Sequence, residues 1–225
     1  MANLDAVIFD IDGTLLDSND ANAYAWRKTF EEFGKTVPQP DIRGAIGKGG
    51  DNLLPDFWSK EELERLEEPL GKRRSEIYQK ELLPKMQAFT LAREFGARLR
   101  EDGYKVAVAS SAKREELEVS LEIIGFESLI QAQTSTDDAK SSKPDPDIFL
   151  AALDRLGGPD PARVIVVGDT PYDVTAAKKA GMRTVAVLCG GFSRESLEEA
   201  GAIAIYQSPS EMLLRYDETP FAKEE

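Results

Sequence analysis

Histidine is absent from this sequence of 225 residues. Without it the chain builds no Ser-His-Asp triad, no Cys-His pair and no histidine-ligated zinc site. Any acid–base chemistry near neutral pH must therefore come from carboxylates, lysine or metal-bound water.

Cysteine occurs only once, so the chain has no internal disulfide and fits a reducing compartment. We interpret this residue, Cys189 in the stretch VAVLCGG, as a buried small side chain at a strand end and not as a nucleophile. Long apolar runs are also missing, and none approaches the roughly 20 residues that span a bilayer. Because a predicted strand follows Met1 closely, with no basic and apolar leader, we expect the cytoplasm as the location.

Positive charge is scarce: 28 lysine and arginine residues face 41 aspartate and glutamate residues, for a net charge of −13. We expect neither nucleic acid nor an anionic membrane as a partner, because both require basic surfaces. A small phosphorylated or otherwise anionic metabolite remains compatible, provided that a metal or a few lysines reverse the local field.

Short apolar runs rich in valine and isoleucine recur along the chain, as is typical of strands buried on both faces of a parallel sheet. Helical patterns that end in glycine lie between several of them. This alternation predicts an α/β fold with a doubly wound, mostly parallel sheet. The predicted strands are 6–9, 105–111, 129–135, 163–169, 183–188 and 202–206, and the helices between them are 114–125, 147–157, 172–181 and 193–201.

One interval is too long for a simple crossover. Nearly a hundred residues separate the first two strands, whereas a crossover needs about a dozen. The excess, residues 17–83, shows helical patterns and no convincing strand. We interpret it as a helical domain inserted over the carboxyl edge of the sheet, which leaves 1–16 and 84–225 as the α/β domain. Trp26 and Phe30 are expected in the core of the inserted domain, and the tail ETPFAKEE is expected to be frayed.

Polar residues follow several predicted strands, and ligands of open α/β sheets bind beyond the carboxyl ends of the strands. Carboxylates that met there would repel one another without a cation, and oxygen ligands favour Mg²⁺. In GDTPYD, a threonine that caps a helix and a proline at its first position would turn the last aspartate back toward the cluster. The candidates are Asp10, Asp12 and Thr14 after the first strand, Ser110 and Ser111 after the second, Lys143 in SKP, and Asp169 and Asp173 in GDTPYD.

Four motifs occur in the order DIDGT, a serine after an apolar strand, SKP and GDTPYD. This ordered set resembles the haloacid dehalogenase superfamily, and the likeness covers nearly the whole chain. The long helical insertion is similar to the first type of cap in that superfamily, as in phosphoglycolate phosphatase-like members and β-phosphoglucomutase. The resemblance implies a Mg²⁺-dependent hydrolase of small phosphate monoesters.

The resemblance also implies a role for each candidate. Asp10 would attack phosphorus to form an aspartyl-phosphate, and Asp12 would protonate the leaving alcohol and then deprotonate water. Asp10, the Asp12 carbonyl and Asp169 would bind Mg²⁺, with Asp173 in or just behind that shell. The phosphoryl oxygens would be held by Ser110, Ser111, Thr14 and Lys143.

Three other functions compete with this interpretation. A sugar phosphomutase similar to β-phosphoglucomutase would carry a histidine early in the cap, where this chain has Asn22. Haloacid dehalogenation needs neither Mg²⁺ nor a second aspartate, so the intact Asp10-x-Asp12 counts against it. A phosphorylated signalling module resembling a receiver domain would have no use for the inserted domain or for an acid–base Asp12.

The stretch GAIGKGG at 44–50 is not a P-loop, because Lys48 is followed by glycine and no buried strand precedes it. We interpret it as a hinge or substrate loop of the inserted domain. Arg43 and Lys48 are predicted to offer positive charge to the distal group of a substrate, with a solvated loop as the alternative. Hinges for a swinging inserted domain are predicted near Leu16–Ser18 and Leu83–Gln87.

Overall fold

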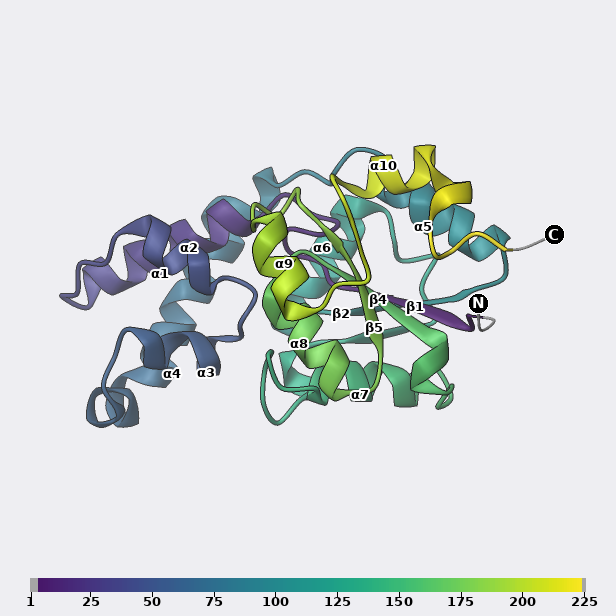
Figure 1. The fold of residues 1–225 in the computed structure, drawn as a ribbon. Coiled ribbons are helices and arrows are strands. Elements are labelled where there is room, and N and C mark those ends of the chain that lie inside the picture. The colour runs from purple at the N-terminus through teal and green to yellow at the C-terminus, as the bar shows by residue number, and fades with distance from the viewer. Residues whose placement is uncertain (1–3, 224–225) are drawn as a thin grey trace.

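The computed structural model describes residues 4–223 and shows a six-stranded sheet with helices on both faces (Figure 1). The strand order is β3-β2-β1-β4-β5-β6, and every recorded pair of neighbouring strands is parallel. The six predicted strands and the doubly wound α/β class are therefore confirmed. The strands are β1 Ala6–Phe9, β2 Lys105–Ala109, β3 Ala132–Thr134, β4 Val164–Gly168, β5 Arg183–Val187 and β6 Ala204–Tyr206.

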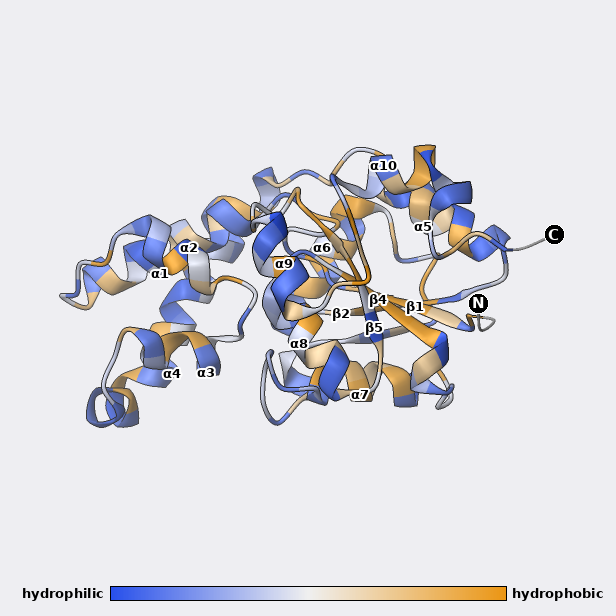
Figure 2. Cartoon of the chain, viewed as in Figure 1, coloured by the Kyte–Doolittle hydropathy of each residue, from blue (hydrophilic) through white to orange (hydrophobic). Residues whose placement is uncertain are grey.

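Side chains of β1 alternate between two hydrophobic cores, as the two-residue period of a strand requires. Val7 and Phe9 enter one core, which the helices α5, α6 and α10 help to fill. Ala6 and Ile8 enter the other core, which α7 and α8 cover. Figure 2 shows the strands as an apolar centre between helices of mixed polarity. The helices of this part are α5 Ala92–Glu101, α6 Arg114–Ile124, α7 Asp147–Arg155, α8 Pro171–Lys179, α9 Arg194–Ala200 and α10 Pro209–Leu214.

Between β1 and α5 the chain forms a helical segment, which lies beside the α/β part in Figure 1. Trp26 and Phe30 belong to its own hydrophobic core, with ring centroids 5.7 Å apart, and Trp58 packs on Phe30 at 5.7 Å. The proposed boundaries of an inserted domain at 17 and 83 stay a prediction. The helices of the segment are α1 Asn19–Glu32, α2 Gln39–Ala45, α3 Gly50–Leu53 and α4 Lys60–Ile77, and a single π turn, Tyr78–Leu82, follows.

The two connections between the helical segment and the α/β part run side by side. Asp17 N donates to Gln87 O over 2.9 Å, and Phe89 N donates to Leu15 O over 2.9 Å. The first of these bonds joins the two predicted hinges, and the second lies just outside both of them. Movement about that junction stays a prediction.

The C-terminal residues differ from the sequence-based expectation. Phe221 is fully buried in the core under α5, where its ring meets Phe95 at 5.5 Å, and its carbonyl accepts from Tyr104 Oη over 2.7 Å. The prediction of a frayed tail is thus wrong as far as Phe221. Burial of this one aromatic side chain holds the tail on the core, although the residues around it are mostly polar. Residues 224 and 225 lie outside the described part of the chain.

No helix within residues 4–223 is both long enough and apolar enough to cross a lipid bilayer.

Candidate active site

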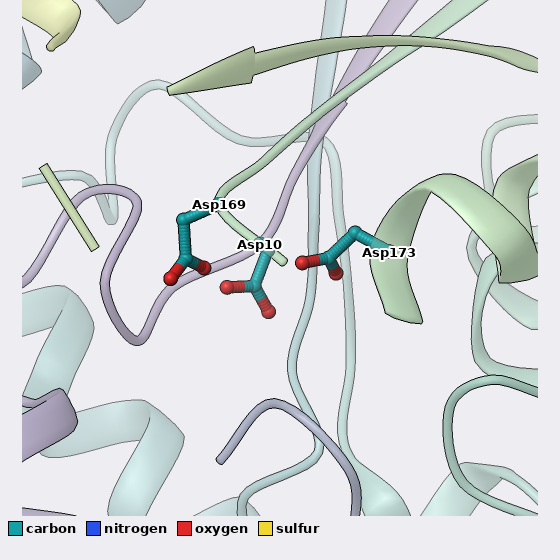
Figure 3. A group of neighbouring side chains, drawn as sticks. All are labelled: Asp10, Asp169 and Asp173. Carbon is teal, nitrogen blue, oxygen red and sulfur yellow. The ribbon is translucent and has the colours of Figure 1, made fainter. Parts of the chain in front are cut away.

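Three aspartates meet at the carboxyl ends of β1 and β4, where the strand order reverses (Figure 3). Asp10 follows β1, Asp169 follows β4, and Asp173 lies in the first turn of α8. One carboxylate oxygen from each lies within 4.8 Å of the other two, and all three residues are buried. The site thus occupies the switch point at which α/β sheets bind ligands.

Asp169 sits in a close-fitting cradle. Thr14 Oγ1 lies 3.2 Å from its Oδ1, and Asn19 Nδ2 donates to its Oδ2 over 2.8 Å. A Cβ atom at Gly13, whose φ is +82°, or at Gly190 would overlap the Asp169 carboxylate. Both glycines are therefore required for the backbone to close around this side chain.

Lys143 bridges the other two aspartates. Its Nζ lies 2.5 Å from Asp10 Oδ1 and 2.7 Å from Asp173 Oδ1, and the lysine is 1% exposed. The other oxygen of Asp173 completes a capping box with Thr170 at the start of α8, with Pro171 at the first helical position. Both oxygens of Asp173 already have partners, so its carboxylate is held rigidly behind Asp10.

The charges in this cluster are not balanced by the protein alone. Burial raises the pKa of Asp10 from 3.8 to about 7, and the neighbouring Lys143 offsets only part of that effect. Burial, together with Asp10 and Asp173, raises the pKa of Asp169 well above its ordinary value. A bound cation would reverse both shifts. Buried carboxylate oxygens, with neither histidine nor cysteine among them, fit a hard divalent ion such as Mg²⁺.

Asp12 points from the same loop toward the helical segment. Its Oδ1 accepts from Ser18 Oγ at 2.5 Å, Asn22 Nδ2 at 3.0 Å and Tyr78 Oη at 3.4 Å. No hydrogen bond is recorded for its Oδ2 among the described residues. One oxygen is therefore held by three donors, and Asp12 is among the residues that line the cavity.

A cavity of about 550 Å³ lies between the helical segment and the α/β part, with Asp10 and Asp12 in its wall. Ser111 also lines it, and the Ser111 hydroxyl is buried with no hydrogen-bond partner among residues 4–223. Ser110, in contrast, lies outside the lining, and its Oγ accepts from Ala112 N over 3.1 Å. Because Ser110 Oγ is recorded only as an acceptor, its hydroxyl can still donate, and the prediction that both serines hold phosphate stays a prediction.

The other predicted phosphate and substrate residues lie in different surroundings. The Thr14 hydroxyl sits between Asp10 and Asp169 and does not line the cavity. Lys48 lines the cavity but pairs with Asp56 at 2.5 Å. Arg43 lies outside the lining, where it pairs with Asp20 at 2.9 Å and bonds the carbonyl of Gly190. The predicted contact of Arg43 with a substrate stays a prediction.

The loop that carries Lys143 is anchored by Asp138. This carboxylate accepts from Ser135 N at 3.0 Å and pairs with Arg114 at 2.9 Å and Arg155 at 2.5 Å. Partial burial opposes its charge, but the bond from Ser135 and the two guanidinium groups prevail and lower the pKa of Asp138 from 3.8 to about 2. The charged form is thus favoured in the folded state.

Replacing Asp138 by Asn tests that anchor. Because the folded-state pKa is lowered, the stabilisation is present above the unfolded-state value of 3.8 and is lost as the pH falls toward 2. We expect Asp138→Asn to lower the free energy of unfolding by about 1–2 kcal/mol at pH 7. Urea denaturation at a series of pH values should show the gap between variant and wild type narrowing below pH ~4. A gap that stays constant to pH 3 contradicts the assignment.

The switch point of this doubly wound sheet combines three buried carboxylates that could hold a cation, a buried lysine and a further aspartate that lines a cavity. Such a combination is typical of an α/β enzyme with an acidic reaction centre. The chain belongs to the haloacid dehalogenase-like hydrolase family, because the sequence model of that family matches residues 7–187.

Similar proteins agree with that assignment. The chain is 31% identical over 215 residues to a phosphorylated carbohydrates phosphatase of Thermotoga maritima, covering 93% of this chain and 97% of that one. It is 32% identical over 190 residues to a phosphoglycolate phosphatase of Aquifex aeolicus, covering 82% and 84%. A solved Bacteroides vulgatus protein assigned as a β-phosphoglucomutase superposes with a TM-score of 0.82 at 25% identity, covering 96% and 88%. The predictions of this superfamily and of a phosphatase-class enzyme are confirmed.

The sequence did not single out several residues of the site. Asn19 holds Asp169, and Tyr78 reaches Asp12 from the far end of the helical segment. Asn19 could have been suspected, because it stands within ten residues of the first motif at the start of a helix. Tyr78 carries no local signal, since only the folding back of α4 brings it to the site.

Proposed function

We propose that the chain is a Mg²⁺-dependent phosphomonoesterase that works through an aspartyl-phosphate on Asp10. The observation that carries the proposal is the geometry of the pair Asp10 and Asp12. Asp10 lies among the carboxylates and Lys143, while Asp12 lines the cavity with one oxygen held by Ser18, Asn22 and Tyr78. This arrangement supports attack by Asp10 and proton transfer by Asp12.

In the first step, an Asp10 oxygen forms a bond to phosphorus while the bond from phosphorus to the leaving oxygen breaks. Asp12 gives its proton to that oxygen, which leaves as an alcohol. In the second step, Asp12 takes a proton from water, whose oxygen attacks phosphorus. The bond from phosphorus to Asp10 breaks, orthophosphate leaves, and both carboxyl groups return to their first states.

The remaining residues hold charge in place. Asp10, the Asp12 carbonyl and Asp169 would bind Mg²⁺, which would neutralise the anionic phosphoryl group, and Asp173 would support that site through its bond to Lys143. Lys143 and the hydroxyls of Ser110 and Ser111 would donate to the phosphoryl oxygens. Arg43 and Lys48 remain candidates for contact with the distal part of the substrate.

The helical segment is proposed to act as a cap that forms one wall of the cavity. Trp26 of α1 and Leu54 line the cavity from that side, and so do charged residues of α4. A volume of about 550 Å³ accommodates a small metabolite, and the names of the relatives point to phosphorylated carbohydrates and phosphoglycolate as first trials. The cytoplasmic location stays a prediction.

A phosphomutase is the second candidate, favoured by the similarity to the β-phosphoglucomutase-assigned structure. The two reactions differ only in whether water or a sugar hydroxyl receives the phosphoryl group. Asn22, which bonds Asp12 here, cannot exchange a proton at neutral pH as a histidine does. We therefore place hydrolysis first.

The experiment is a phosphate-release assay over phosphoglycolate, sugar phosphates, nucleoside monophosphates and p-nitrophenyl phosphate. We expect orthophosphate from at least one of these esters, with activity lost when EDTA removes the metal and restored by excess Mg²⁺. Interconversion of sugar phosphates without net orthophosphate would identify the mutase instead. Chloride release from 2-chloropropionate without metal would identify a dehalogenase, and a label that persists on Asp10 without turnover would identify a signalling module.

A further inference from the structure

Glu116 is a fully buried carboxylate for which the proposed chemistry has no use. It lies in the first turn of α6, in the α/β part, and is 0% exposed. All three of its recorded side-chain partners come from the helical segment. Arg74 Nη1 lies 2.6 Å from its Oε2, Ser75 Oγ donates to its Oε1 over 2.8 Å, and Gln79 Nε2 does so over 3.4 Å.

The pair of Glu116 and Arg74 joins the two parts of the chain. A buried carboxylate is tolerated only when it is paired and hydrogen-bonded, and the helix N-terminus adds a further favourable field at this position. Separating α4 from α6 would leave an uncompensated charge on each side. The pair therefore favours the arrangement in which the helical segment is docked on the α/β part.

Arg74 also reaches toward the active site. Its Nη2 donates to Asn22 Oδ1, and Asn22 Nδ2 donates to Asp12 Oδ1 over 3.0 Å. Arginine can only donate and an ionised aspartate can only accept, so these two neighbours leave a single orientation for the Asn22 amide. The Arg74 guanidinium lies 4.6 Å from the ring centroid of Tyr78, whose hydroxyl also donates to Asp12.

We propose that Glu116 is a positioning residue for Asp12 that acts through Arg74. By fixing Arg74, it sets Asn22 and Tyr78 as donors to Asp12 Oδ1 and leaves Oδ2 to carry the proton for the leaving group. Because Arg74, Asn22 and Tyr78 all belong to the helical segment, Asp12 is correctly oriented only when that segment is docked. The inference rests on the proposed role of Asp12 as acid.

The test compares two leaving groups. Protonation by Asp12 matters for an alkyl phosphate, whose leaving group is a poor one, and matters little for p-nitrophenyl phosphate, whose phenolate leaves unaided. The ratio kcat/KM reports the steps up to and including departure of the alcohol. We expect Glu116→Gln to lower kcat/KM about 30-fold or more for the alkyl phosphate that wild type hydrolyses fastest. For p-nitrophenyl phosphate the change should stay within about threefold.

Arg74→Lys serves as the second variant should Glu116→Gln fail to fold, which thermal unfolding would reveal. It keeps the positive charge but replaces the planar guanidinium, which contacts Glu116 through Nη1 and Asn22 through Nη2, by a single ammonium nitrogen, so we expect the same selective loss. The loss of kcat/KM in the double variant should be no larger than in the poorer single variant, because Glu116 acts on Asp12 through Arg74. Glu118→Gln is the matched control, since Glu118 lies exposed on the same helix and should match wild type on both substrates.

Equal losses on the two substrates, or no loss, in variants that fold would overturn the role of Glu116. Such a result leaves the proposed function standing, because wild type would still hydrolyse both esters. Failure of wild type to hydrolyse any phosphate ester with Mg²⁺ present overturns the proposed function itself. The two failures are thus separated by the wild-type arm of the same assay.

Discussion

Asp10→Asn is expected to lower kcat by at least about a thousandfold on every ester that the wild-type protein hydrolyses. Asparagine has nearly the same shape as aspartate, but its amide oxygen is too weak a nucleophile to attack phosphorus. The reason for so large an effect is that neither of the two other aspartates in the buried cluster can take the place of Asp10. Asp173 has both oxygens engaged, and Asp169 is fixed in its cradle by Thr14 and Asn19.

The chemistry predicts an observable intermediate as well. Acid quenching of wild type during turnover of a ³²P-labelled ester should leave label on the protein that hydroxylamine releases, as expected for an acyl phosphate. Asp10→Asn should carry no such label while keeping the wild-type circular dichroism spectrum. Asp17→Asn is a suitable control, because Asp17 is exposed and lies in the same loop region. Label retained in Asp10→Asn would move the nucleophile to another residue.

The sequence was a good guide to the α/β part because its strands are buried on both faces. In β1, β2, β4 and β5 that burial required nearly continuous Val, Ile and Ala runs, which no solvent-facing strand or loop would carry. Helix α8 was equally legible, since its Thr-Pro start is a local capping signal. The burial of Phe221 could not be predicted from the sequence around it, because it depends on packing against residues more than a hundred positions earlier, such as Phe95.

The same distinction separates the parts of the site. Asp10 and Asp169 could be placed together because each follows a recognisable strand and parallel strands end at one edge, and the Thr-Pro helix start predicted that Asp173 turns back toward them. Glu116 could not be identified in this way. It lies in a run of acidic helical residues, and nothing in the sequence distinguishes it from the exposed Glu115 and Glu118. Its buried carboxylate depends on Arg74, which pairs with it from a distant part of the sequence.

The second prediction with a large effect is Lys143→Met, which should lower kcat/KM by about 100- to 1000-fold. Burial disfavours the ammonium form, but the adjacent Asp10 and Asp173 raise the pKa of Lys143 above its ordinary value, so it is charged throughout the neutral range. The variant loses the one cation in contact with both Asp10 and Asp173 in the described structure. The phosphoryl group would then face carboxylates without a lysine to offset them.

Two binding measurements should move in opposite directions. Without Lys143 the cluster is more negative, so Mg²⁺ in the absence of substrate should bind more tightly by isothermal titration calorimetry. Orthovanadate, an anionic phosphate analogue, should bind more weakly when Mg²⁺ is saturating, because a donor to its oxygens is gone. A simple loss of structure would weaken both, and Lys178→Met, which removes an exposed lysine from α8, should change neither. Activity of Lys143→Met within fivefold of wild type would show that the lysine balances the resting carboxylates but takes no part in holding the phosphoryl group.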